Sequence, residues 1–134
     1  MTIRVNHSLR RALSLDAAMS AVAAVAFVAG AGLISSLTAL PQSLLLWAGI
    51  VLVPWTALLG WAATRAELSS LLVKDVIGVN VLWAAASFGL LLSGTVQPNA
   101  LGVAFVGAQA VAVAVFAWLQ SAALRGLSAA PGAA

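Results

Sequence analysis

The sequence has few charged side chains and no cysteine. Only 7% of its 134 residues are charged, whereas soluble globular domains carry about 25%. This is too little charge to cover the surface of a soluble domain. Without cysteine the chain cannot form disulfides, use a thiol as a nucleophile or ligate an iron–sulfur cluster. The one histidine, His7, lies outside the apolar segments. The sequence therefore predicts no metal site and no cofactor, and it allows a bound lipid.

Apolar residues make up 63% of the chain and are concentrated in long runs. A run of about 20 such residues is long enough to cross the hydrocarbon core of a bilayer as a helix. Four runs of this kind are present, at residues 17–40, 44–63, 76–94 and 100–124. We therefore predict an all-α membrane protein, an antiparallel four-transmembrane-helix bundle formed by a single domain over residues 1–134. Residues 126–134 are small and are predicted to be a disordered tail.

The first apolar run has an alternative interpretation as a cleaved signal peptide, because Arg10 and Arg11 precede it. Signal peptides have an apolar region of about 7–15 residues followed by a cleavage site. Here the run is much longer and no clear cleavage site follows it. We therefore expect the first run to be retained as a transmembrane helix.

The positive charges are distributed unevenly between the connections. They precede the first run, lie between the second and third, or follow the fourth: Arg4, Arg10, Arg11, Arg65, Lys74 and Arg125. Loops rich in lysine and arginine stay on the cytoplasmic side. We therefore predict a multi-pass membrane protein with both termini cytoplasmic. Because the basic residues are scattered rather than clustered, no nucleic-acid partner is expected.

The three acids also fall on the predicted cytoplasmic side. Asp16 and Asp75 each come directly before a predicted span, where a carboxylate can cap the helix N-terminus. Glu67 is expected to be a solvated charge in the middle connection. A proton or cation relay is the alternative role for the acids. However, no ionisable residue lies inside the predicted spans, and this counts against coupled transport, which usually depends on such residues.

Uncharged polar residues do fall inside the spans. At 1.5 Å per residue, Asn80 and Gln120 lie at one depth and Gln109 lies about 15 Å further out. Asn80 is therefore predicted to hydrogen-bond Gln120 or the Trp118 indole, and Gln109 to pair with Ser87. Two interpretations remain open. These groups hold the helices together, or they line a ligand cavity.

Three tryptophans from different spans, Trp55, Trp83 and Trp118, are predicted to lie at a similar depth. Pro54 removes a backbone hydrogen bond in the second span and favours a local opening. Together these features suggest an intramembrane cavity for an amphiphilic ligand, although tryptophans that simply fill a core would give the same pattern. The candidate residues are Asn80, Trp83, Ser87, Gln109, Trp118, Gln120, Pro54 and Trp55.

The chain resembles a group of small bacterial four-transmembrane-helix integral membrane proteins of unknown function. The resemblance is carried by 13–16 and Pro54, by Asn80, Trp83 and Ser87, and by the segments 97–98, 101–102, 104–106, Gln109 and 119–120. It covers most of the chain, implies the bacterial cytoplasmic (inner) membrane as the location, and implies no activity. Trp55 stands where the resemblance leads us to expect tyrosine, so a hydroxyl is missing from the candidate cavity.

Two functions follow from these features as hypotheses. The first is a non-catalytic accessory or scaffold subunit that acts through helix packing, with another membrane protein or a second copy of itself as partner. The second is a binder or transporter of a lipid or another hydrophobic small molecule in the cavity lined by tryptophan and amide side chains. An enzyme is the least favoured class, because no catalytic constellation is present. Membrane lipid is expected as a partner in either case.

Overall fold

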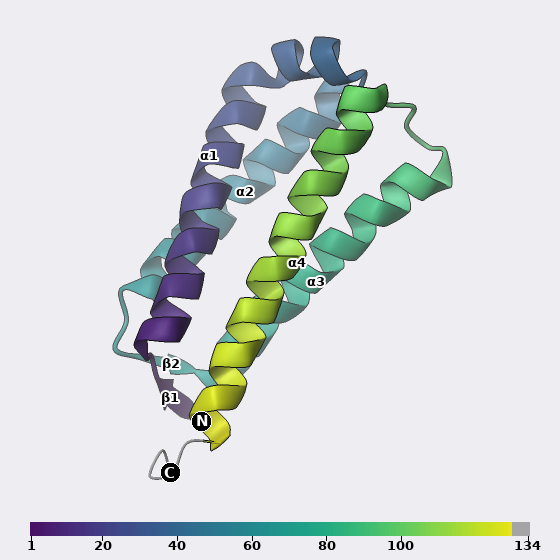
Figure 1. Cartoon of the computed structure of the whole chain (residues 1–134). Helices are drawn as coiled ribbons and strands as arrows, with labels where there is room; N and C mark the ends of the chain where they lie inside the picture. The colour runs from purple at the N-terminus through teal and green to yellow at the C-terminus, as the bar shows by residue number, and fades with distance from the viewer. Residues whose placement is uncertain (130–134) are drawn as a thin grey trace.

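A computed structural model describes residues 1–129, and within them it shows four helices and two short strands (Figure 1). The elements are β1 (Thr2–Arg4), α1 (His7–Thr38), α2 (Gln42–Ala63), β2 (Glu67–Ser69), α3 (Ser70–Ser93) and α4 (Ala100–Ala129). Each of the four helices is long and apolar enough to cross a membrane. The predicted all-α fold with four apolar helices packed against one another is confirmed.

The helices pack unequally around the bundle axis. α1 lies along α2 and α4, and α3 lies along α4, whereas α2 and α3 make little contact with each other. β1 pairs with β2, with Ile3 opposite Leu68, so the N-terminus lies beside the α2–α3 connection. At the other end, the Asn99 amide donates to the Thr38 carbonyl at 3.0 Å. Figure 1 shows the paired strands and the start of α4 at opposite ends of the bundle.

The first helix begins ten residues before the predicted start of its span. Asn6 is its N-cap, and the Asn6 side chain accepts a hydrogen bond from the Leu9 amide at 2.8 Å. Leu9 and Leu13 are buried in the bundle, so the segment before residue 17 packs as part of the helix. The prediction that Asp16 caps this helix is therefore wrong, because Asp16 already lies in its third turn.

The third helix also begins earlier than predicted. Ser69 stands at its N-cap position and Asp75 lies within the helix as an exposed side chain, so the prediction that Asp75 caps the helix is wrong. The connection predicted between residues 65 and 75 is shortened by β2 and by the first turn of α3. α4 continues to Ala129, so the first part of the tail predicted to be disordered, 126–129, is helical. The rest of that tail lies outside the described residues.

Buried apolar side chains gather in two separate clusters near the two ends of the bundle. The cluster at the β1–β2 end consists of Leu9, Leu13, Leu59, Ala62, Leu68, Val73, Val76 and Ala123. The cluster at the opposite end consists of Ala31, Leu40, Leu45 and Val106. Helices α1, α2 and α4 each supply residues to both clusters, and on each of them the two sets are separated along the helix. The candidate site lies between the clusters, in the middle of the bundle.

Candidate functional site

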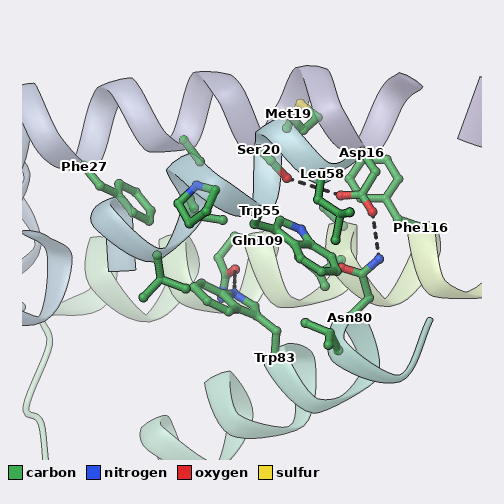
Figure 2. A pocket seen from close by; sticks show the side chains of 17 residues that line it. Asp16, Met19, Ser20, Phe27, Trp55, Leu58, Asn80, Trp83, Gln109 and Phe116 are labelled. Atoms are coloured by element: carbon green, nitrogen blue, oxygen red, sulfur yellow. Dashed lines mark hydrogen bonds between the residues drawn. The ribbon is translucent and has the colours of Figure 1, made fainter. Parts of the chain in front are cut away.

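A cavity of about 380 Å³ lies between the two apolar clusters. All four helices contribute side chains to its wall, as Figure 2 shows. The lining residues are Asp16, Met19, Ser20, Ala23, Phe27, Val51, Leu52, Pro54, Trp55, Leu58, Val79, Asn80, Trp83, Gln109, Ala112, Val113 and Phe116. Small side chains such as Ala23 and Ala112 and the ring of Pro54 leave the space that larger residues would fill. The volume falls within the range of about 300–1,000 Å³ typical of small-molecule sites.

Asp16 is the one ionisable side chain in this wall, and three neutral side chains hydrogen-bond it. The Asn80 and Gln120 amides donate to its Oδ2 at 2.7 and 2.8 Å. The Asn80 amide also donates to the Gln120 carbonyl oxygen at 3.0 Å. Ser20 donates to the other carboxyl oxygen, Oδ1, at a longer 3.3 Å. This cluster, Asp16–Ser20–Asn80–Gln120, joins α1, α3 and α4 at one depth in the bundle.

The surroundings of Asp16 combine deep burial with an absence of positive charge. The residue is 2% exposed, Asn80 is 3% exposed and Gln120 is fully buried. Among the described residues that line the cavity or bond Asp16, none is a lysine, arginine or histidine. A carboxylate buried without an opposite charge is costly unless hydrogen bonds or a cation compensate it. Amides supply that compensation at Oδ2, whereas Oδ1 receives only the long bond from Ser20.

A second polar cluster lies one helical turn further along α3. The Trp83 indole N–H donates to Gln109 Oε1 at 3.0 Å, and Gln109 Nε2 donates to Ser87 Oγ at 2.8 Å. Gln109 Nε2 also donates to the Val106 carbonyl at 3.0 Å. These bonds satisfy Gln109 within the wall and hold the Trp83 ring against the cavity (Figure 2).

The remainder of the wall is apolar and aromatic. Figure 2 shows Phe27, Trp55 and Phe116 projecting from α1, α2 and α4 around the same space that Asp16 and Asn80 border. Three lining residues, Met19, Val51 and Val79, are largely exposed at the helix surface. The cavity is therefore continuous with the outer surface of the helices, and two of these three residues lie on α2 and α3, which make little contact with each other.

Most of the predicted cavity residues lie at or directly behind this wall. Pro54, Trp55, Asn80, Trp83 and Gln109 line the cavity. Ser87 and Gln120 lie behind it and bond lining residues, and the predicted Asn80–Gln120 and Gln109–Ser87 contacts are confirmed.

Trp118 does not belong to the site. It is 62% exposed on the outer face of α4, so its predicted place in an aromatic layer and its predicted contact with Asn80 are wrong. The depth of Trp118 along the helix is similar to that of the site, but its side chain points to a different side. Its neighbours Ala117 and Gln120 are the residues of that turn that face inward.

We did not predict Ser20, Phe27 or Phe116 as lining residues. We placed Asp16 at the end of a helix rather than in the cavity wall. Asp16 is buried within α1, one of the four helices able to span a membrane, so the prediction that no span contains an ionisable residue is wrong. A usable signal was present. Leu9, Leu13, Asp16 and Ser20 follow the spacing i, i+4, i+7 and i+11, which places them on one face of a helix. Since Leu9 and Leu13 must be buried, the same face carries Asp16 into the bundle.

Comparison with known proteins supplies no relative for this chain. No protein-family model, no curated protein and no solved structure matches it. Function is therefore argued from the chemistry of the site. The described residues contain no group of three or more histidine, cysteine or acidic side chains that could hold a metal ion. The cavity presents a ligand with apolar and aromatic surface, two amide side chains, a serine hydroxyl and one carboxyl group.

Proposed function

We propose that this protein binds an amphiphilic small molecule, such as a lipid, in the cavity between its four helices. The single observation that carries the proposal is the cavity itself, an apolar space with a few polar groups converging on it. Cavities of that composition are the usual form of small-molecule sites in proteins. Of the two functions suggested by the sequence, this one uses the most specific feature of the molecule.

The polar clusters support the proposal by the way they are positioned. A cluster whose only role was to join helices would be equally effective in the fully packed ends of the bundle. Instead, Asp16, Ser20, Asn80 and Gln109 all border the cavity. The exposed lining residues Val51 and Val79 would allow a hydrophobic ligand to enter from the lipid rather than through the aqueous connections.

Filling the cavity is expected to remove the bound molecule. Ala112→Phe places a large ring in the cavity, because Ala112 lines it. Ala108→Phe is the matched control, since Ala108 lies one turn earlier on α4, is exposed and does not line the cavity. Native mass spectrometry of protein purified in mild detergent should detect a bound amphiphile in the wild type and in Ala108→Phe, and most of it should be lost from Ala112→Phe. A wild type that carries no adduct, or equal adducts in both variants, would contradict the proposal.

The placement proposed for this binding protein is the bacterial cytoplasmic membrane. The four helices would cross it in alternate directions, in an antiparallel arrangement with both termini cytoplasmic. The distribution of positive charge supports this orientation, because the α1–α2 and α3–α4 connections carry no charged residue. The cluster around Asp16 would then lie in the cytoplasmic half of the bilayer.

Cysteine labelling tests this topology cleanly, because the chain has no cysteine of its own. Gln97→Cys places a thiol at an exposed position in the α3–α4 connection, and Glu67→Cys places one at an exposed position beside α3. A membrane-impermeant maleimide added to intact spheroplasts should label Gln97→Cys, and should label Glu67→Cys only after permeabilisation. The reverse pattern would invert the proposed orientation.

The accessory-subunit hypothesis stays a prediction. All four helices expose apolar side chains, such as Val22, Val53, Leu82 and Val111. Lipid would cover such surfaces as readily as a protein partner or a second copy would. No feature of the described surface distinguishes these partners, so the cavity provides the better-supported function.

A further inference from the structure

The amphiphile site has an asymmetry that restricts what it can bind. One end of the cavity wall carries a carboxyl group with the amide and hydroxyl groups that bond it, and most of the rest is aromatic and aliphatic. Of the two carboxyl oxygens of Asp16, Oδ2 accepts two short bonds from amides. Oδ1 accepts one long bond from Ser20, which itself lines the cavity. An ionised carboxyl group has about four acceptor positions on its two oxygens, so capacity remains at Oδ1, beside the cavity.

We propose that the ligand is an amphiphilic amine, bound in its protonated form, whose ammonium N–H donates to Asp16 Oδ1 while its apolar body lies against Trp55, Trp83 and Phe27. The inference rests on the proposed function, because it names the ligand class of the same cavity. The choice of an amine follows because the described residues around Asp16 supply no positively charged side chain. The fold places a carboxyl group in an apolar space, supplies amides for one oxygen, and brings no lysine, arginine or histidine near the other.

The aromatic lining suits a cation as well as an apolar body. Ammonium groups are attracted to the faces of tryptophan and phenylalanine rings, most strongly where water is excluded. Trp55 and Phe116 flank Asp16 in the cavity wall (Figure 2). The Trp83 indole N–H, by contrast, is already committed to Gln109, so this ring presents its apolar surface rather than a donor. An anionic amphiphile would place its charge against Asp16 and is disfavoured.

The test uses three probes that share one apolar body, namely phenylbutylammonium, phenylbutanol and phenylbutyl-trimethylammonium. Their binding is measured by titration calorimetry on protein in phosphatidylcholine nanodiscs, with empty nanodiscs subtracted. Since a charge-assisted hydrogen bond in a site of this kind corresponds to about tenfold or more in affinity, phenylbutylammonium should bind the wild type about tenfold more tightly than phenylbutanol does. The quaternary probe keeps the charge but has no N–H, so it should bind more weakly than the ammonium probe.

Two variants assign this preference to Asp16. Asp16→Asn keeps the shape and an oxygen for the Asn80 and Gln120 amides but removes the charge, and should lower ammonium affinity about tenfold, so that the preference for phenylbutylammonium over phenylbutanol is lost. Asp75→Asn removes an acid that is exposed on α3 and should change neither. If Asp16→Asn does not fold, the ratio of the wild-type affinities for phenylbutylammonium and phenylbutanol is sufficient to test the amine assignment.

The outcomes separate this inference from the proposed function. Equal affinity of the wild type for ammonium and alcohol, unchanged in Asp16→Asn, would overturn the amine assignment and leave an amphiphile site without charge preference. Equal affinity for the ammonium and quaternary probes would overturn the hydrogen bond to Oδ1. If none of the three probes binds and Ala112→Phe loses no adduct, both the assignment and the proposed function fail.

Discussion

Replacing Asn80 with leucine is expected to lower the free energy of unfolding by about 1.5–3 kcal/mol, the range for hydrogen bonds to charged groups. The Asn80 amide donates to both Asp16 and Gln120, and all three residues are almost completely buried. Leucine has a similar size, so packing is largely kept while Asp16 loses one of its two short bonds. Removing one partner of a buried charge is costly because the charge stays behind. Unfolding by a denaturing detergent in mixed micelles, followed by tryptophan fluorescence, measures the loss.

Gln109→Leu is the matched control for this prediction. It makes the same kind of change on α4, but Gln109 bonds only neutral partners, namely Trp83, Ser87 and the Val106 carbonyl. Neutral interhelical hydrogen bonds in membranes contribute on average about 0.6 kcal/mol, so Gln109→Leu should cost clearly less than Asn80→Leu. If the two variants lowered the free energy of unfolding equally, the buried carboxyl group would not strengthen the hydrogen bonds of Asn80.

A double-mutant cycle isolates the contact itself. Once Asp16→Leu has removed the carboxyl group, Asn80→Leu no longer leaves a buried charge short of donors. The double variant is therefore expected to be less destabilised than the sum of the two single variants, as residues in one network usually are. Strict additivity would show that the two side chains act independently despite the 2.7 Å between them.

Gly102→Ala is expected to lower the free energy of unfolding by about 1–3 kcal/mol, the usual cost of overpacking. Gly102 lies at the end of the bundle away from β1 and β2. A Cβ atom at this position would overlap the Thr38 carbonyl oxygen and would lie 2.6 Å from the Pro98 Cβ. The first is a backbone atom, and it already accepts the Asn99 amide at the start of α4. The clash therefore cannot be relieved by turning a side chain, and α1 and α4 must move apart. Thermal unfolding in detergent measures the effect.

Gly107→Ala should raise the unfolding temperature in the same assay or leave it unchanged. Gly107 lies on the same helix, and nothing lies within 4 Å of a Cβ atom placed there. Alanine is favoured over glycine in a helix by up to about 1 kcal/mol, so stability should be unchanged or should rise. If both glycine variants lost stability equally, the close approach of α4 to the end of α1 would be contradicted.

The sequence predicted the helices and much of the site because both depend on simple periodicity. Apolar run lengths located the four helices, although not their ends. Helical rise placed Asn80 level with Gln120 and Gln109 near Ser87, and both pairs are hydrogen-bonded. Depth along a helix is fixed by counting residues. The direction in which a side chain points is not, and Trp118 shows the difference, since it shares the depth of the site but lies on the outer face.

Two features could not be obtained from hydropathy. The charges of Arg10, Arg11 and Asp16 lower the hydropathy of the first segment, so the apolar run begins after a helix that is already ten residues long. The second feature is a contact of Arg10. Its guanidinium group donates hydrogen bonds to the carbonyls of Ala63 and Arg65 at the end of α2. Such a contact, like the pairing of β1 with β2, joins segments more than fifty residues apart and depends on the tertiary fold rather than on local pattern.

The central claim is that the space between the helices is a binding site with Asp16 at its edge. A crystal structure of the wild-type protein grown in a lipidic mesophase tests it most directly. We expect elongated non-protein density in the cavity, with one end within hydrogen-bonding distance of Asp16 Oδ1 and the rest lying against Trp55 and Trp83. A map in which these side chains close over the space and leave no density between them would contradict the account.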